Sequence, residues 1–327
     1  ERISHVDTAW LRMDRPENLM KILGVMILEG RINAERFKRT VAQRMLRYRR
    51  FRQIAREDAD GTWWVDDPDF DIDAHVRHSS LPAPRSTHEL QKFVAEMASS
   101  PLNPARPRWE FNLVDTARGN SALVVRIHHA IADGIALLGV IHSLTDAAAN
   151  APEHGGPEEP DDDDAGDVPD GDAFWRTILD PLTDVALASI RLGGHLWGQF
   201  LGLRNDPAGI RDYARVAAAI AQEVGNLALL PNDSPTRFKG KPGTVKRVAW
   251  SEPIALPDIK AVGKVLGCSV NDTLLAAVAG ALRGYLVARG DPVVSTAAIR
   301  AMVPVNLRAA SDADELGNRF GLVALEL

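Results

Sequence analysis

The chain has 327 residues, of which 45% are hydrophobic and 25% are charged, and it carries a formal net charge of −6. This composition is that of an ordinary globular protein, and it excludes a collagen-like, wholly disordered or disulfide-stapled chain. The one cysteine, Cys268, cannot form an internal disulfide and no Cys/His cluster has zinc spacing, so we expect a reducing, cytoplasmic compartment. No uncharged apolar run reaches the ~18 residues that a membrane-spanning helix needs.

Residues 1–150 alternate between strand and helix patterns. Apolar residues recur at helical spacing over 34–46, whereas 121–127 is a continuous apolar run typical of a buried strand. The predicted elements are, in chain order, a strand at 19–29, a helix at 34–46, a strand at 62–65, a helix at 88–98, strands at 109–114 and 121–127, and a helix at 134–149. We therefore expect an N-terminal α/β lobe over residues 1–150.

An acidic segment follows this lobe. Residues 153–172 contain ten Asp or Glu and no Lys or Arg, so removing them from a net charge of −6 leaves the rest of the chain at +4. Residues 151–172 also contain four prolines and four glycines. Mutually repelling charges without an apolar face predict a disordered linker over 151–172.

Positive charge is concentrated over residues 31–56, where ten Lys or Arg stand against one acid. Such a cluster attracts phosphates or anionic lipid, but a solvated helix face gives the same pattern. A nucleic-acid partner is not expected, because the positive excess is small and no aromatic-interleaved binding motif accompanies it.

The chain after the linker divides into a helical part and a second α/β part. Helical periodicity over 174–203 and 208–230 predicts a helical crossover across 173–232. The aromatic and basic residues of 174–203 are typical of an interfacial helix, although a crossover helix packed on its own lobes fits equally well. The pattern of 233–327 predicts the start of a C-terminal α/β lobe. Its predicted elements are a strand at 246–250, helices at 256–266 and 270–289, and strands at 296–305 and 321–327. Because the last strand would leave a raw sheet edge, we expect this second lobe to be incomplete.

The heptapeptide His-His-Ala-Ile-Ala-Asp-Gly, residues 128–134, joins a predicted strand to a predicted helix. Loops at strand ends are where α/β sheets place catalytic groups. Adjacent residues at a strand end point to opposite sides, so His128 and His129 cannot share a role. A neutral imidazole accepts a proton at cytosolic pH, which makes one of them a suitable general base for an alcohol or thiol nucleophile. Asp133 either orients this base or pairs with an Arg to fix the loop. Gly134 lets a helix start close to the strand, or lets a ligand pass near the backbone.

Two other interpretations fit the same residues. The pair is also explained as core histidines beside an N-capping Asp133. Zinc binding by His129 and Asp133 lacks the third protein ligand of a catalytic site, so we expect no metal. The sequence contains no nucleophile elbow, no zincin motif, no P-loop and no dinucleotide-binding glycine motif.

The stretch Arg126–Gly134 resembles the His-His-x-x-x-Asp-Gly active-site motif of acyl-CoA-dependent acyltransferases. From residue 3 to 327 the chain is similar to the bacterial wax ester synthase/diacylglycerol acyltransferase family. The other matching stretches are, in the family's order, Ile3–Trp10, which is similar to Leu-Ser-x-x-Asp; Pro107–Trp109, similar to Pro-Leu-Trp; Val270–Gly280, similar to the Asn-Asp helix; and Met302–Arg308 and Gly317–Asn318. Arg108 departs from the family pattern, because it replaces the Leu of Pro-Leu-Trp.

The resemblance implies a two-lobed α/β fold of the chloramphenicol-acetyltransferase type, with a tunnel between the lobes. It also implies that His129 is the catalytic base and that His128 is its structural neighbour. Asp133 would shape the loop through a salt bridge, for which Arg308 is our choice of partner.

Five further positions are expected to be structural or to contact substrate. Gly134 ends the motif, and Asn271 and Asp272 fall on the Asn-Asp block, where an N-cap role explains them equally well. Pro107 and Trp109 belong to the Pro-Leu-Trp block, but such residues are more often part of a core.

The activity that the resemblance implies is transfer of a fatty acyl group from acyl-CoA to a long-chain alcohol or diacylglycerol, giving wax ester or triacylglycerol. Acyl-CoA is then a co-substrate, and no cofactor is expected. A peripheral position on the inner membrane or on a lipid-body surface suits such substrates. Two alternatives stay open. One is a condensation or polyketide-associated acyltransferase that takes its acyl group from a carrier protein, and the other is a lipid-binding member without turnover.

Overall fold

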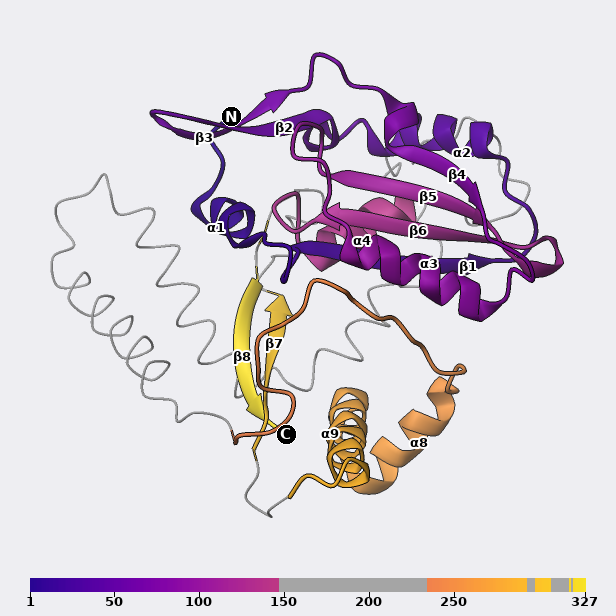
Figure 1. The fold of residues 1–327 in the computed structure, drawn as a ribbon, viewed down its shortest axis with the longest axis vertical. Helices are drawn as coiled ribbons and strands as arrows, with labels where there is room; N and C mark the ends of the chain where they lie inside the picture. Colours follow the sequence, from indigo (N-terminus) through magenta and orange to yellow (C-terminus); the bar gives the residue numbers. More distant parts are fainter. Residues whose placement is uncertain (147–233, 293–297, 307–317, 319) are drawn as a thin grey trace, which may run out of the picture. The chain divides into compact units, whose positions relative to one another are not determined.

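A computed structural model describes residues 1–146, 234–292, 298–306, 318 and 320–327. The chain separates into two compact units (Figure 1). The described part of the first unit consists of residues 1–146 and 241–251 together with Asn318. The second unit contains the other described residues.

The first unit contains α1 (His5–Met13), β1 (Lys21–Leu28), α2 (Ala34–Thr40), a π-helical turn (Val41–Met45), β2 (Gln53–Asp58), β3 (Gly61–Asp66), β4 (Val76–Ser80), α3 (Thr87–Ser99), β5 (Trp109–Asp115), β6 (Ser121–His128) and α4 (Gly134–Ser143). The strands β2 and β3 form an antiparallel hairpin. The other four strands form one sheet in the order β1-β6-β5-β4, in which β6 pairs antiparallel with both neighbours and β4 runs parallel to β5 (Figure 1). The central strand β6 is buried along its whole length.

Two hydrophobic clusters cover the two faces of this sheet, because alternate residues of each strand point to opposite sides. On one face, Val125 and Ile127 of β6 pack with residues of α4 and of the π-helical turn. On the other face, Val124 packs with Leu90 and Val94 of α3. The sheet is therefore a middle layer with helices on both sides, and β6 delivers the motif to its edge.

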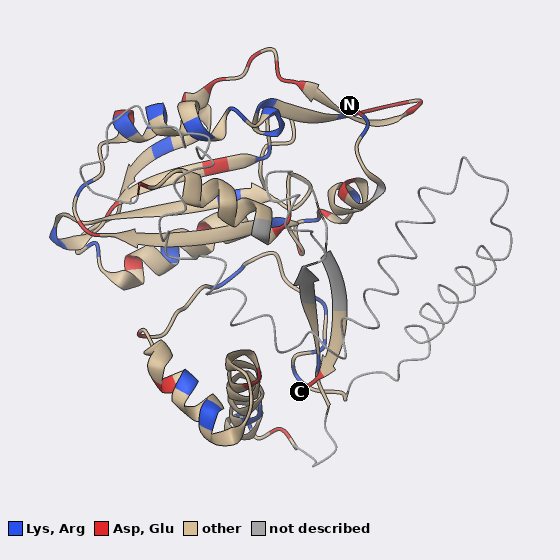
Figure 2. Ribbon diagram, turned by 180° about the vertical axis from the view of Figure 1, so that it is seen from behind, with Lys and Arg blue, Asp and Glu red and all other residues tan. Residues whose placement is uncertain are grey.

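The basic segment 31–56 lies on and after α2, where Figure 2 shows blue segments beside red ones. Several of its cations are engaged in ion pairs. These pairs are Lys38–Asp73 at 2.7 Å, Arg44–Asp146 at 2.7 Å, Arg49–Asp66 at 2.7 Å and Arg50–Glu1 at 3.0 Å. Internal pairing accounts for much of this charge, which favours a structural face over a phosphate-binding surface.

The second unit contains α8 (Leu256–Leu266), α9 (Val270–Ala288) and the antiparallel pair β7 (Arg300–Asn306) and β8 (Phe320–Glu326). Helix α8 ends at Gly267, which adopts φ +66°, a left-handed conformation that glycine reaches without steric cost. Among the described helices, none alone is long and apolar enough to span a membrane. Helices α8 and α9 together meet that test but are bent by 97° at their junction.

The predicted helices and strands agree with most described elements, with two kinds of exception. Residues 246–250 are not a strand, so that prediction is wrong. Val248 and Trp250 pack instead against the α3 cluster of the first unit, and the Lys246 amide donates to Ser99 Oγ at 2.8 Å. The alternating pattern reflects the inward-facing Val248 and Trp250, but these side chains pack on a helix cluster and the segment pairs with no described strand. Helix α1 and strands β2 and β4 were not predicted, and the expected linker (151–172) and crossover (173–232) lie outside the described residues.

Candidate functional site

The motif begins at the last residue of β6 and ends at the first residue of α4. Its backbone continues the sheet, because the His128 amide donates to the Arg108 carbonyl and the His129 amide donates to the Met20 carbonyl, both at 2.9 Å. Asp133 is the N-cap of α4, and its carboxylate accepts from the Ala136 amide at 2.9 Å. The loop is therefore held at both ends by the two elements that it joins.

His128 is a buried residue with both ring nitrogens engaged. Its side chain is 1% exposed, and Nδ1 lies 3.0 Å from the Ala130 amide, which donates to it. Nδ1 is thus unprotonated and Nε2 carries the hydrogen, which faces Asp14 Oδ2 at 3.4 Å. Burial, followed by the nearby Arg108, lowers the pKa of His128 to about 4. A neutral ring with both nitrogens fixed is suited to a structural role.

Arg108, the residue that departs from the family's Pro-Leu-Trp, lies beside this histidine. Its Nη1 is 3.3 Å from Asp14 Oδ2 and 3.5 Å from His128 Nε2. Asp14 also accepts from the Met20 amide at 2.9 Å. Arg108 therefore forms an ion pair with Asp14 beside His128.

A second charged network lies on the same face of the sheet as His128. Arg126 donates to Glu110 at 2.7 Å and also to the carbonyl of Ser100, just past the end of α3. Lys21, the cross-strand partner of His128, donates to the Met97 and Ser100 carbonyls. Burial and the charge of Arg126 lower the pKa of Lys21 to about 8. Cations at a helix C-terminus stabilise it, so this network holds the end of α3 beside the motif.

His129 has a different environment, as the alternation of side chains predicts. It is half-buried, and its ring stacks on Trp10 of α1 with centroids 4.8 Å apart and planes inclined by 19°. Its Nδ1 is buried and has no hydrogen-bond partner among the described residues. Burial lowers the pKa of His129, whereas the charge of Asp133 acts in the opposite direction. The ring is therefore a neutral proton acceptor at pH 7.

Asn318 contacts this histidine from a distant part of the sequence. Its Nδ2 donates to the His129 carbonyl at 2.7 Å and to Asp7 Oδ1 at 2.6 Å. Asp7 belongs to α1 and is 7% exposed, and burial raises its pKa. Helix α1, the motif and Asn318 thus form one connected cluster.

Gly134 begins α4, and a Cβ built on it would meet no described atom within 4 Å. The prediction that Gly134 lets the helix start close to the strand is therefore wrong, because a side chain would have room here. Passage of a ligand near the backbone stays a prediction. Arg308, the expected partner of Asp133, lies outside the described residues.

Pro107 and Trp109 belong to the interior of the first unit. Trp109 is 0% exposed, its Nε1 donates to the Phe51 carbonyl at 2.8 Å, and its ring stacks on His75 at 4.5 Å. Both line a small pocket of about 200 Å³ at the same sheet edge as the motif, together with the exposed Arg106. These contacts give Trp109 a packing role, and Pro107 is buried beside it.

Asn271 and Asp272 lie at the start of α9 in the second unit, but neither is its N-cap. Ser269 is the cap, accepting from the Asp272 amide at 3.1 Å, while Asp272 accepts from the Ser269 amide at 2.9 Å. The N-cap interpretation is therefore wrong in position, because the reciprocal capping box begins two residues earlier. The side-chain nitrogen of Asn271, Nδ2, is buried and has no hydrogen-bond partner among the described residues.

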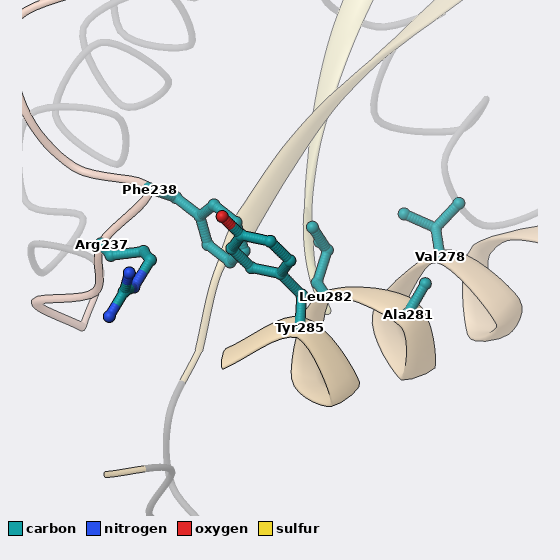
Figure 3. Close-up of a pocket in the computed structure, with 6 residues that line it drawn as sticks. All are labelled: Arg237, Phe238, Val278, Ala281, Leu282 and Tyr285. Atoms are coloured by element: carbon teal, nitrogen blue, oxygen red, sulfur yellow. The ribbon is translucent and has the colours of Figure 1, made fainter. Parts of the chain in front are cut away.

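A pocket of about 470 Å³ lies elsewhere in the second unit (Figure 3). Phe238 and Tyr285, whose rings stack with centroids 5.7 Å apart, line it together with Val278, Ala281 and Leu282 of α9. None of the predicted site residues that the structure describes lines this pocket. Within the described parts of the chain, no three His, Cys, Asp or Glu side chains are grouped to hold a metal ion.

Comparison with known proteins assigns the chain to a family. Residues 3–274 match the profile of the wax ester synthase/diacylglycerol acyltransferase catalytic domain. The chain belongs to this family. The probable diacylglycerol O-acyltransferase tgs2 of Mycobacterium tuberculosis is 33% identical over 272 residues, which are 81% of this chain and 53% of that protein. A putative diacylglycerol O-acyltransferase of the same species is 28% identical and covers 95% of this chain and 60% of the relative. The chain thus spans little more than half the length of these wax ester synthase/diacylglycerol acyltransferase relatives.

Solved structures show the same fold. The wax ester synthase/diacylglycerol acyltransferase of Marinobacter aquaeolei VT8 matches with a TM-score of 0.57 at 22% identity, covering 93% of this chain and 65% of that one. A variant starter condensation domain of rhizomide synthetase, in complex with C8-CoA, matches with a TM-score of 0.57 at 16% identity, covering 99% and 66%. These matches confirm the predicted α/β fold class.

Several residues of the site were not predicted from the sequence. Trp10, Asp7 and Asn318 fall in stretches that resemble family blocks, but the resemblance assigned them no role. Asp14 and Lys21 carried no signal at all, because their contacts with the motif come from neighbouring strands and loops.

Proposed function

We propose that the protein transfers a fatty acyl group from acyl-CoA to the hydroxyl of a long-chain alcohol or diacylglycerol. The observation that carries the proposal is the pair of motif histidines with separate roles, one fixed at both nitrogens and the other stacked, half-buried and neutral. Family membership, relatives named as diacylglycerol O-acyltransferases and a fold shared with a C8-CoA complex support acyl-CoA as the donor.

In this proposal His129 is the general base. Its Nδ1 is enclosed by protein, so we assign proton transfer to Nε2. Nε2 takes the proton of the acceptor hydroxyl while the oxygen attacks the thioester carbon. The tetrahedral intermediate then collapses, the carbon–sulfur bond breaks, and the thiolate of coenzyme A takes the proton back from His129. The products are an ester and free coenzyme A.

Direct transfer needs no protein nucleophile. The one thiol, Cys268, belongs to the second unit, at the turn between α8 and α9, and lies 3.6 Å from the Thr273 hydroxyl. An activated nucleophile needs an adjacent base, and no described His forms a hydrogen bond with this thiol. We expect intersecting double-reciprocal plots, because both substrates must be bound together, and full activity in Cys268→Ser. Parallel plots, or an acylated peptide formed with acyl-CoA alone, would contradict direct transfer.

The acceptor and the acyl donor are tested together. Purified protein is incubated with radiolabelled palmitoyl-CoA and either hexadecanol or diacylglycerol, and the products are separated by thin-layer chromatography. Labelled wax ester or triacylglycerol supports the proposal. Transfer only from a phosphopantetheine-loaded carrier protein would favour the condensation-type alternative, and binding without product would favour a lipid-binding member.

No cofactor is needed in this scheme, since acyl-CoA is a co-substrate. Lipid substrates suit a peripheral position on a membrane or lipid-body surface. Flotation with liposomes, with and without anionic lipid, tests that position, and protein that stays at the bottom of both gradients would contradict it.

A further inference from the structure

We propose that Asn318 is a positioning residue for His129, joining the backbone of the base to the helix whose tryptophan supports its ring. The inference rests on the proposed role of His129 as the base. It assigns a role to a residue that lies 189 positions beyond the histidine in the sequence.

The side-chain amide of Asn318 is oriented without ambiguity. Its Nδ2 faces two oxygens, the His129 carbonyl at 2.7 Å and Asp7 Oδ1 at 2.6 Å, and an NH₂ group has one hydrogen for each. The opposite orientation would place Oδ1 against two acceptors. In the observed orientation Oδ1 is buried with no hydrogen-bond partner in the described part of the chain. The two hydrogen bonds donated by Nδ2 thus form at the cost of leaving the buried Oδ1 unpaired.

Both ends of the bridge lead to the same imidazole. Asp7 and Trp10 are three residues apart on α1, so they lie on neighbouring positions of one helix face. Asp7 accepts from Asn318, and Trp10 stacks on the His129 ring at 4.8 Å. The Ser4 hydroxyl caps the helix by accepting from the Asp7 amide at 3.0 Å. Asn318 thus fixes the distance between the backbone of His129 and the surface on which its ring rests.

This arrangement predicts a loss in turnover rather than in substrate binding. A general base must lie within hydrogen-bond reach of the proton that it removes, and a displacement of about 1 Å can cost about 100-fold in rate. Asn318→Ala removes both hydrogen bonds, while the side chains of Trp10 and His129 themselves are unchanged. We expect kcat to fall by about 10- to 100-fold with little change in the KM for acyl-CoA.

The control is Asn112→Ala, which removes another buried amide from the same unit. Asn112 lies on β5 and is 4% exposed, and its side-chain nitrogen has no hydrogen-bond partner among the described residues. If Asn318 were only a packing residue, the two variants would show similar shifts in melting temperature and the same kcat. We expect the loss of kcat in the Asn318 variant only.

A reciprocal exchange separates the two hydrogen bonds. In the double variant Asp7→Asn with Asn318→Asp, the amide at position 7 donates to the carboxylate at position 318, so the side-chain pair is restored. The carboxylate has no hydrogen to donate to the His129 carbonyl, so that bond stays lost. We expect the melting temperature to recover relative to Asn318→Asp alone, while kcat stays low.

The pH profile gives a readout that packing alone would not move. Loss of the two Asn318 hydrogen bonds lets water reach the imidazole, so the pKa of His129 rises toward its ordinary value. The acid limb of the kcat/KM profile should shift to higher pH in Asn318→Ala. Trp10→Leu removes the other support of the ring and should give the same shift, which keeps the test valid should Asn318→Ala not fold.

Three results decide the matter. Wild-type kcat and an unshifted pH profile in Asn318→Ala, or full activity in the reciprocal double variant, would overturn the positioning role. His129→Ala is measured alongside. If that variant keeps wild-type turnover, the proposed function fails, and a low kcat in Asn318→Ala would then have another cause.

Discussion

Replacing His128 tests whether the first motif histidine is a buried, neutral structural residue. His128→Asn places an amide oxygen near the position of Nδ1, so the Ala130 amide keeps an acceptor. His128→Ala leaves that buried amide unpaired, which costs about 1–3 kcal/mol beyond the loss of the ring itself. We therefore expect the Ala variant to unfold at lower denaturant than the Asn variant, with a difference of about 1–3 kcal/mol.

The pH dependence of stability follows from the pKa of His128. Its folded pKa is about 4, whereas the ordinary value is ~6.5. Between these values the unfolded chain binds a proton that the folded chain does not, so stability is full above pH 6.5 and falls as the pH drops. The loss that arises from this residue reaches about 2 kcal/mol at pH 5 and about 3 kcal/mol below pH 4.

The assay is chemical denaturation of wild type and His128→Asn at pH 7.5 and pH 5. Comparing the two proteins removes the contribution of the other histidines, including His129. Wild type should lose about 2 kcal/mol more than the variant between the two pH values. Equal losses of stability in both proteins would refute a neutral buried His128. A larger loss in the variant would mean that burial raises the pKa of His128 instead of lowering it.

Substitutions at three further positions test the loop and its neighbour Arg108. Asp133→Asn keeps an acceptor for the N-cap of α4 and Asp133→Ala does not, so the Ala variant should be less stable by about 1 kcal/mol in thermal unfolding. Removing the Asp133 charge lowers the pKa of His129, so the acid limb of kcat/KM should move to lower pH in Asp133→Asn, and an upward shift would contradict the electrostatic assignment. Arg108→Leu removes a charge that lowers the pKa of His128, so the stability loss toward pH 5 should shrink; a steeper loss would argue against this electrostatic effect. Gly134→Ala meets no described atom, so its melting temperature should not fall while the KM for a substrate rises, and an unchanged KM would exclude passage of a ligand there.

Local patterns predicted the motif-bearing part of the fold. The apolar residues of β6 and the helix after Asp133 are specified by their own sequence, because a strand buried on both faces is mostly apolar. Arg126 and His128, the charged and polar exceptions near its end, have polar partners. Two adjacent histidines at the end of that strand were correctly expected to have different environments. The N-capping role of Asp133 was also among the interpretations that the sequence allowed.

Elements stabilised by distant contacts gave no local signal. Strand β4 has the polar sequence Val-Arg-His-Ser-Ser and exists because it pairs with β5. Helix α1 packs through Trp10 on His129, which is 119 residues further along the chain. Asn318 reaches the same histidine across an even longer separation. Sequence periodicity reports burial within a segment, so it identifies neither the partner nor the atoms that meet.

The most direct test of the account is single-turnover acyl transfer by His129→Ala and His128→Asn in the same buffer. Loss of a positioned general base should lower the rate of His129→Ala by about 10²–10⁴-fold at a nearly unchanged melting temperature. His128→Asn should keep most of its rate and lose stability instead. A His129→Ala protein that turns over within tenfold of wild type, or a His128→Asn protein that is folded and inactive, would contradict the assignment of His129 as the base.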